Sequence, residues 1–136
     1  MKKARALAAA AAATAAGAAI LIAPGTAQAA EDTRAQAAWN CAKGNVCFYS
    51  GAGGTGVSCR SDGTEARWVN QTCLNTTFKS FYNNGYVGPL DHVRAYTGFN
   101  FTGTSYCLHV GWDEGRGSFP GSGVKLKSHK WFTGEC

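Results

Sequence analysis

Histidine, serine and acidic side chains in the second half of the chain could support acid–base or nucleophilic chemistry. His92 directly follows Asp91, His109 lies further along, and Ser105 or Ser118 could act as a nucleophile. Hydrolysis by a serine needs a base that is oriented by a carboxylate and aimed at the hydroxyl. Nothing in this spacing sets up that arrangement, so we predict no catalytic residue and no enzyme activity.

Trp112, Asp113 and Glu114 lie together in a loop that reads Trp-Asp-Glu-Gly-Arg-Gly. Two carboxylates that hydrolyse a substrate normally flank it from separate elements, so these sequence neighbours are better suited to solvent. An exposed indole could stack on a sugar or anchor a protein partner. Large aromatic side chains are mostly buried, so burial in the core or at its edge is the default expectation for Trp112. These three residues are our candidates for partner binding.

Six cysteines could form a metal centre, a redox pair or disulfides. The chain has no Cys-x-x-Cys pair, and its three histidines stand far from any cysteine cluster. The ligand spacing of a zinc site is therefore missing, and we predict neither a metal nor a cofactor. An even number of cysteines in an exported chain is typical of a disulfide framework. We interpret all six as structural: Cys41, Cys47, Cys59, Cys73, Cys107 and Cys136. Six cysteines allow fifteen connectivities, and the sequence alone does not choose among them.

Residues 1–29 have the features of a secretory signal peptide. Basic residues precede an alanine-rich apolar run over 6–22, and Ala27-Gln28-Ala29 offers a small-residue cleavage pattern. A transmembrane anchor is the alternative, but the apolar run is barely long enough and Pro24-Gly25 closes it. We therefore predict a secreted, extracellular protein with no membrane-spanning segment.

Loss of this segment changes the charge of the protein. The whole chain has a formal net charge of +5, with 13 basic and 8 acidic side chains. Lys2, Lys3 and Arg5 leave with the signal peptide, so 10 basic side chains remain against 8 acidic ones, a net charge of +2. A charge this small requires neither nucleic acid nor an anionic membrane as a partner.

The chain also contains an internal repeat. Residues 46–58 and 93–105 share the spacing of Val, Tyr, a Ser/Thr-Gly pair, a Thr-Gly pair and Ser. Phe78-Lys79-Ser80 recurs as Leu126-Lys127-Ser128 at nearly the same offset. Two copies of a unit of roughly 45 residues are too few for a solenoid. They predict two similar supersecondary motifs packed face to face.

Short runs of aromatic and β-branched residues, separated by Gly, Asn and Ser, predict an all-β domain. Expected strands cover residues 46–50, 57–60, 78–83, 93–96, 105–110 and 124–131, and a helical turn is expected over 65–72. The glycines of 51–56 fit a tight hairpin; a phosphate-binding loop lacks the following helix and Lys-Ser/Thr pair. Residues 30–38 form an expected flexible tail. Residues 39–136 form one domain, with motifs at about 41–88 and 89–136.

The second copy resembles the signature of a βγ-crystallin Greek key. That motif has an aromatic residue, a second aromatic five positions on, a glycine seven positions on, and a serine in a later strand. The matching residues of the second copy are Tyr96, Phe101, Gly103 and Ser128. In the first copy Tyr49, Gly56 and Ser80 match, but Gly54 occupies the position of the second aromatic residue. The resemblance implies a single βγ-crystallin-like domain of two Greek-key motifs, stabilised by disulfides.

Residues 41–51, Cys-Ala-Lys-Gly-Asn-Val-Cys-Phe-Tyr-Ser-Gly, resemble the start of secreted bacterial proteins grouped with the Streptomyces metalloproteinase inhibitor. The resemblance implies a peptidase inhibitor, with metalloproteinases as targets, whose rigid loop blocks the protease cleft. It also implies a Cys41–Cys47 disulfide. Cys59 and Cys107 stand one position apart when the repeats are overlaid, so that each would pair downstream, giving Cys59–Cys73 and Cys107–Cys136.

Two departures from these families limit what can be transferred. The inhibitor type presents its reactive bond between two cysteines about five apart, and this chain has no such pair after Cys47. Crystallin calcium sites place a hydroxyl where this chain has Lys79 and Lys127, and an ammonium group repels a cation. We therefore assign no reactive bond and expect no tight calcium site.

The loops Gly51–Gly56, Gly85–Pro89 and Val110–Gly117 remain open as inhibitory loops. We expect a monomer with an extracellular peptidase as its partner. The alternative function is a cell-wall or carbohydrate-binding module, or a small antimicrobial protein, on the same scaffold.

Overall fold

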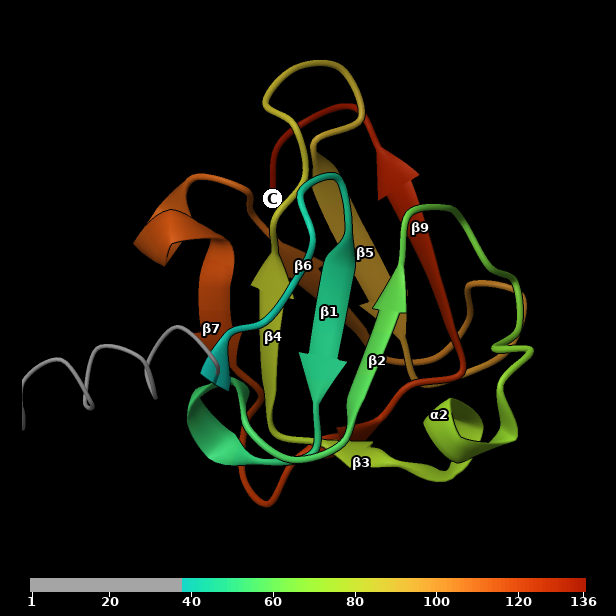
Figure 1. The fold of residues 1–136 in the computed structure, drawn as a ribbon. Coiled ribbons are helices and arrows are strands. Elements are labelled where there is room, and N and C mark those ends of the chain that lie inside the picture. The colour runs from blue at the N-terminus through green and yellow to red at the C-terminus, as the bar shows by residue number, and fades with distance from the viewer. Residues whose placement is uncertain (1–37) are drawn as a thin grey trace, which may run out of the picture.

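The computed structural model describes residues 38–136, so the predicted signal peptide and residues 30–37 of the predicted tail lie outside the described part. Short strands dominate this part (Figure 1). Its elements are β1 (Val46–Tyr49), η1 (Ala52–Gly54), β2 (Ser58–Ser61), α2 (Gln71–Asn75), β3 (Thr77–Phe78), β4 (Ser80–Asn83), β5 (His92–Tyr96), β6 (Ser105–Leu108), η2 (Trp112–Gly115), β7 (Arg116–Ser118), β8 (Val124–Lys125) and β9 (Ser128–Phe132). None of the helices within 38–136 has the length and apolar character needed to cross a membrane.

The strands form two main antiparallel sheets, one behind the other in Figure 1, with the orders β2-β1-β4-β7 and β6-β5-β9. In each half of the chain a hairpin, β1–β2 or β5–β6, is joined by a later strand, β4 or β9, that returns beside its first strand. The predicted all-β domain of two Greek-key motifs is therefore confirmed.

Each half also contributes to the sheet of the other half. Strand β7 belongs to the second half of the chain but pairs with β4 of the first. In return, Glu65 of the first half forms an antiparallel bridge with His129 in β9. A two-stranded sheet, β3 with β8, adds a further link between the halves. The two motifs are thus interlocked rather than merely packed against each other.

Several predicted boundaries were wrong. The expected strands 78–83 and 124–131 are each broken, because Lys79 and Lys127 donate their N–H groups to Tyr49 and Tyr96 where the chain crosses between sheets. The three-residue strand β7 was not predicted, since Arg-Gly-Ser carries no strand pattern.

The predicted helical turn over 65–72 was also misplaced. Glu65 pairs with β9, and helix α2 begins only at Gln71. The Asn70 side chain caps this helix by accepting hydrogen bonds from the N–H groups of Thr72 (2.9 Å) and Cys73 (3.4 Å). An Asn at the N-cap satisfies donors that the first helical turn leaves free.

Two serines hold the folded hairpins of the two copies in the same way. The Ser80 hydroxyl donates to the carbonyl of Gly51 (2.7 Å) and accepts from the N–H of Gly54 (3.0 Å). Ser128 repeats both bonds, at the same two distances, with Gly98 and Phe101. The internal repeat therefore encodes a hairpin that is closed onto its own sheet.

Trp39 replaces the aromatic residue that the first hairpin lacks. In the second copy the ring of Phe101 meets Tyr96 edge to face, with centroids 5.9 Å apart. In the first copy the Trp39 ring meets Tyr49 edge to face at 5.7 Å. A Cβ built on Gly54 would lie 2.5 Å from the Trp39 ring. Glycine at position 54 thus makes room for an indole that comes from outside the repeat.

We therefore expect Trp39→Ala to lower the free energy of unfolding by about 2 kcal/mol, because the partly buried indole loses its contact with the buried Tyr49 ring. Adding Gly54→Phe to this variant should cost less than adding it to the wild type, because the overlap with the indole is gone and only that with the Ala38 carbonyl oxygen remains. Gly54→Phe alone should destabilise the protein, because the new ring overlaps Trp39. Urea unfolding of the three variants measures these effects, and additive losses would contradict the replacement.

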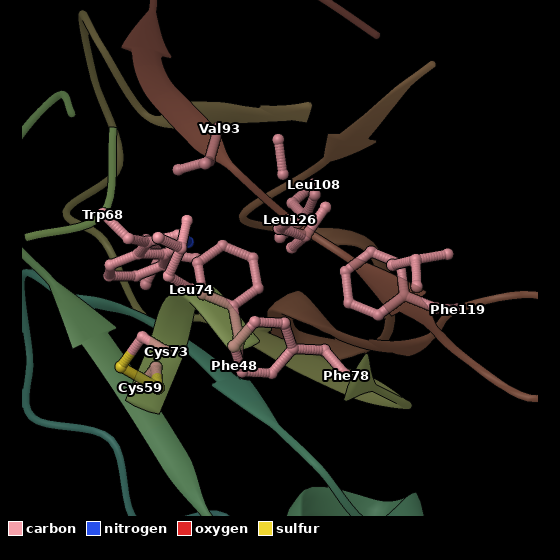
Figure 2. Close-up of a cluster of buried hydrophobic side chains, with 13 residues drawn as sticks. Phe48, Cys59, Trp68, Cys73, Leu74, Phe78, Val93, Leu108, Phe119 and Leu126 are labelled. Atoms are coloured by element: carbon pink, nitrogen blue, oxygen red, sulfur yellow. A yellow bond between two sulfur atoms is a disulfide. The ribbon is translucent and has the colours of Figure 1, made fainter. Parts of the chain in front are cut away.

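The core lies between the two sheets, and Phe48 stands at its centre (Figure 2). Its fully buried ring contacts those of Trp68, Phe78, Phe119 and His129, at centroid distances of 5.8, 5.6, 6.4 and 5.9 Å. Val93, Leu108 and Leu126 of the second half complete the cluster. One hydrophobic core thus serves both motifs.

His129 is fully buried in this core, with its ring 4.5 Å from that of Trp68. Neither of its ring nitrogens has a hydrogen-bond partner within residues 38–136. Burial lowers the pKa of His129 below its usual 6.5, although the nearby Glu65 carboxylate partly opposes the shift. The folded protein therefore holds this imidazole neutral.

Stability is expected to fall as the pH drops below about 6.5. The unfolded chain binds a proton at His129 near its ordinary pKa, whereas the folded chain binds it only at lower pH, so acid favours unfolding. The contribution is complete above pH 6.5 and is lost as the pH falls toward the folded pKa. Urea unfolding at pH 7.5 and 5.5 should show a smaller loss for His129→Phe than for the wild type. Equal losses would show that other groups cause the acid sensitivity.

Three disulfides cross-link the described part of the chain: Cys41–Cys47, Cys59–Cys73 and Cys107–Cys136. These pairs are those of the scheme drawn from the family resemblance and the overlaid repeats. No cysteine of residues 38–136 is free. The first pair closes the turn before β1, the second ties β2 to α2, and the third fixes the carboxyl terminus to β6.

Candidate peptidase-binding loops

The two candidate serines lie apart from the histidines that could have activated them. His92 is buried, with its Nδ1 2.6 Å from Asp91 Oδ1, and its ring meets that of His109 edge to face at 4.4 Å. Ser105 pairs with Tyr96, at the far end of β5 from His92. Ser118 pairs with Ser80 in the other main sheet. Within residues 38–136, neither serine meets a histidine that could serve as its base.

Trp112, Asp113 and Glu114 form an exposed turn, η2. The Trp112 side chain is 65% exposed and stacks on the ring of His109 at 4.5 Å, nearly parallel, so it is not part of the core. Asp113 and Glu114 adopt left-handed conformations, with φ of 46° and 57°. Glu114 lies 3.2 Å from Arg116 across a solvent-exposed ion pair. This turn presents an indole beside two solvated carboxylates.

The glycine-rich loop Gly51–Gly56 is a structural element. Gly54 is buried, and the loop is closed onto Ser80 and against Trp39. The residues that it exposes are small: Ala52, Gly53, Thr55 and Gly56. Such a loop offers a partner neither large side chains nor a protruding backbone.

The loop that connects the two halves has the opposite character. This connecting loop, residues 84–91, protrudes beyond the sheets at the top of Figure 1. It exposes three large apolar side chains: Tyr86 (69%), Val87 (81%) and Leu90 (55%). Leu90 has a φ of 63°, which costs a non-glycine residue about 1–2 kcal/mol. A hollow of about 340 Å³ lies beside the loop, lined in part by Tyr86, Leu90 and Trp131.

The first end of the connecting loop is tied to the turn that the Cys41–Cys47 disulfide closes. Asn84 exchanges backbone hydrogen bonds with this turn, donating to Asn45 (3.0 Å) and accepting from Gly44 (2.8 Å). The Asn84 side chain donates to the carbonyl of Cys41 (2.8 Å), and the Lys43 ammonium donates to that of Gly85 (2.8 Å). The disulfide therefore supports the connecting loop as well as β1.

The second end is held by Asp91. Its carboxylate accepts a hydrogen bond from the N–H of Gly88 (3.1 Å) and contacts the ring of His92. The Gly88 bond is the main reason that the pKa of Asp91 is lowered, with the bond to His92 adding to the effect. The ionised carboxylate thus closes the loop at neutral pH.

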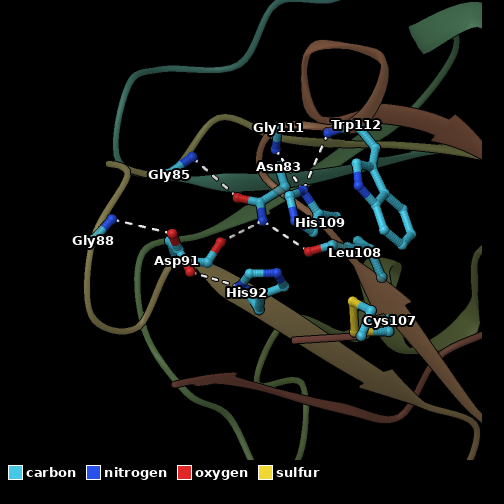
Figure 3. A network of polar contacts seen from close by, with 11 residues as sticks. Asn83, Gly85, Gly88, Asp91, His92, Cys107, Leu108, His109, Gly111 and Trp112 are labelled. Carbon is cyan, nitrogen blue, oxygen red and sulfur yellow. Dashed lines mark hydrogen bonds and ion pairs between the residues drawn. A yellow bond between two sulfur atoms is a disulfide. The ribbon is translucent and has the colours of Figure 1, made fainter. Parts of the chain in front are cut away.

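Asn83 joins the two ends beneath the loop (Figure 3). Its buried amide donates to the carbonyls of Asp91 (2.8 Å) and Leu108 (2.9 Å) and accepts from the N–H of Gly85 (3.1 Å). No sequence motif distinguishes this residue. An asparagine inside a strand is unfavourable unless its amide is hydrogen-bonded. Its place in an expected strand was therefore the one sign in the sequence that Asn83 has a structural role.

The polar network continues from the connecting loop to the Trp112 turn. In Figure 3 the side chains of Asp91, His92, His109 and Trp112 follow one another across the molecule. His109 Nδ1 accepts from the N–H groups of Gly111 (2.8 Å) and Trp112 (3.2 Å), which fixes the start of the turn. The connecting loop and the Trp112 turn, two of the three candidate inhibitory loops, are therefore supported by the same network.

Within residues 38–136 no group of three or more His, Cys, Asp or Glu side chains could hold a metal ion. The serines of the crystallin-type calcium pattern, Ser80 and Ser128, are both engaged with the folded hairpins.

The chain is similar to solved structures and matches one protein family. A βγ-crystallin from Ciona intestinalis has 20% identity and a TM-score of 0.48, with 65% of this chain and 99% of that chain covered. The fifth crystallin domain of the non-lens protein Absent in melanoma 1 has 21% identity and a TM-score of 0.47, with 71% and 95% covered. No curated protein matches the chain. Residues 34–109, more than half of the sequence, match "Peptidase inhibitor family I36", and the chain therefore belongs to that family.

Proposed function

We propose that this protein is a secreted, monomeric inhibitor of extracellular peptidases, and that the connecting loop 84–91 blocks the protease cleft. The observation that carries the proposal is the contrast between the loop's exposed apolar tip and its hydrogen-bonded base. Loss of chain freedom opposes binding, and a loop held in place before binding loses less of it. The exposed side chains supply the apolar area that a protease cleft can bury.

The family match favours this loop over the Trp112 turn. The matched residues, 34–109, include the connecting loop and end before Trp112. The disulfide Cys41–Cys47, on which the resemblance to the Streptomyces metalloproteinase inhibitor rests, closes the turn that holds Asn84. Metalloproteinases are thus our proposed targets, and an inhibitor needs no catalytic residue, metal or cofactor of its own.

The test is titration of the oxidised, secreted protein against a thermolysin-type metalloproteinase, with subtilisin as a control. We expect stoichiometric loss of metalloproteinase activity. If the protein inhibits no extracellular peptidase, the proposal is wrong.

Val87→Asp is expected to raise the inhibition constant at least about 30-fold, because a charge would replace an apolar contact at the loop tip. Val69→Asp provides the matched control, since Val69 is equally exposed (85%) but lies just before α2. Both variants should melt within a few degrees of the wild type, because surface substitutions have small effects on stability. Equal inhibition by the two variants would show that another loop enters the cleft.

The exposed Trp112 supports one alternative, a module that binds cell-wall or other carbohydrate. An indole stacked on one side by His109 is held ready to stack a sugar on the other, and Asp113 and Glu114 could accept hydroxyl hydrogen bonds. A sugar binder would leave peptidases active, would be retained on polysaccharide, and would lose retention in Trp112→Ala.

A further inference from the structure

The outer face of the second sheet carries a cluster of cations and aromatic rings. Alternation along the strands places Val93 and Ala95 of β5 in the core and Arg94 on the opposite face. In β9, His129 is in the core, and Lys130 lies beside Arg94 as its cross-strand partner. Like charges directly opposite each other in a sheet are destabilising. Stability of the fold therefore does not account for the pairing of Arg94 with Lys130.

Two more cations extend this cluster along the second folded hairpin. Lys130 lies over the rings of Tyr96 (5.8 Å) and Phe101 (5.5 Å). Next to them, Lys127 (5.5 Å) and Arg67 (4.8 Å) both lie over the ring of Phe99. We call Arg67, Arg94, Lys127 and Lys130 the basic face.

Within residues 38–136 no carboxylate pairs with these cations. The carboxylates that contact a basic side chain in this part lie elsewhere: Asp91 beside His92, Glu114 beside Arg116 and Glu65 beside His129. The positive charges of the basic face are thus neutralised by no acidic side chain of the described domain, while the aromatic rings hold them in place.

The first half of the molecule provides an internal comparison. There, Cys47 and Tyr82 form the cross-strand pair that corresponds to Arg94 and Lys130. Cys47 is bonded to Cys41, and Tyr82 packs against Trp39 and Arg116. The chain before β1 thus covers this face in the first sheet, whereas the equivalent face of the second sheet carries cations.

Of the basic face, Arg94 lies nearest the connecting loop, whereas Lys127 and Arg67 lie over Phe99, beyond the far end of β5. Arg94 lies 4.9 Å from the ring of Phe132, which contacts that of His92 at 5.7 Å. His92 in turn contacts Asp91, the residue that closes the loop. A partner that receives the loop in its cleft would therefore lie closest to Arg94 and its cross-strand partner Lys130. Arginine and aromatic side chains are enriched in such interfaces.

We propose that the basic face docks on an acidic surface beside the cleft of the target peptidase and speeds association by attraction at a distance. This rests on the proposed function, because it takes the peptidase as the partner. Complementary charges mainly raise the association rate constant, and salt screens them. The dissociation rate constant should depend chiefly on the connecting loop.

The test uses stopped-flow measurement of association with the metalloproteinase at 50 mM and 1 M NaCl. Arg94→Gln/Lys130→Gln should lower the association rate constant about tenfold at low salt and leave it nearly unchanged at high salt. The matched control, Arg60→Gln/Lys79→Gln, removes the same charge from exposed positions of the first half. It should change the rate less than about threefold. A melting temperature within a few degrees of the wild type shows that the first variant is folded, because relief of repulsion and loss of the ring contacts oppose each other.

Equal effects of the two double variants would overturn the proposal, because net charge alone would then explain them. If Arg94→Gln/Lys130→Gln associates normally while Val87→Asp does not inhibit, the inhibitor function stands and the docking proposal fails. If the wild type inhibits no peptidase, both fail. A last outcome concerns anionic polymers. If the wild type is retained on immobilised polyphosphate and Arg94→Gln/Lys130→Gln is not, while the two associate with the peptidase at the same rate, the basic face binds an anionic polymer and the docking proposal is overturned.

Discussion

Asn83→Ala is expected to lower the free energy of unfolding by about 3 kcal/mol and to weaken peptidase inhibition more than tenfold. The substitution removes one amide that satisfies the Asp91 and Leu108 carbonyls and the Gly85 N–H. Each polar group left buried without a partner costs about 1–3 kcal/mol. Inhibition should suffer beyond the loss of stability, because both ends of the connecting loop lose their common support.

Urea unfolding and titration of peptidase activity, at a temperature where the variant remains folded, measure the two effects. Asn75→Ala is a suitable control, since its exposed amide makes one bond within α2 and should matter little to either quantity. A destabilised Asn83→Ala that still inhibits as tightly as the wild type would show that the loop does not depend on its base.

Phe48→Ala is expected to destabilise the protein by about 3–5 kcal/mol, the usual cost of removing a large aromatic side chain from a core. Phe48 belongs to the first sheet, yet it contacts Phe119 and His129 of the second half. The cavity should therefore weaken both motifs together, and unfolding should remain a single transition.

Denaturant unfolding followed by tryptophan fluorescence and by circular dichroism measures this prediction. Phe99→Ala, at a partly exposed position, should cost far less. Two separate transitions for Phe48→Ala would contradict a shared core.

The repeat made the fold predictable, because the positions of Tyr49, Tyr96, Ser80 and Ser128 encode local hairpins. The secondary-structure predictions that failed concern segments whose pairing partners are distant in the chain. Strand β7 forms because β4 offers it an edge, and Glu65 pairs with β9 instead of starting a helix. Short segments with weak propensities follow such tertiary contacts.

The sequence offered three candidate loops but no basis for preferring one of them. Ranking them required the exposure of Val87 and Trp112 and the contacts of Asn83, and all three arise from the assembled fold. The role of Trp39 was hidden for a related reason. Gly54 marked a missing ring in the sequence, but the residue that fills the gap lies outside the repeat.

A peptidase can cleave its own inhibitor, and the strands exchanged between the halves determine what such a cleavage would do. Each disulfide closes within one half, so in residues 38–136 the connecting loop is the covalent link between halves. Hydrolysis of one bond there would yield two fragments that still complete each other's sheets through β7 and Glu65. The new termini would stay close together, held by Asn83 and Asn84. A molecule cleaved in the connecting loop would therefore keep its fold, and its fragments should separate only on unfolding.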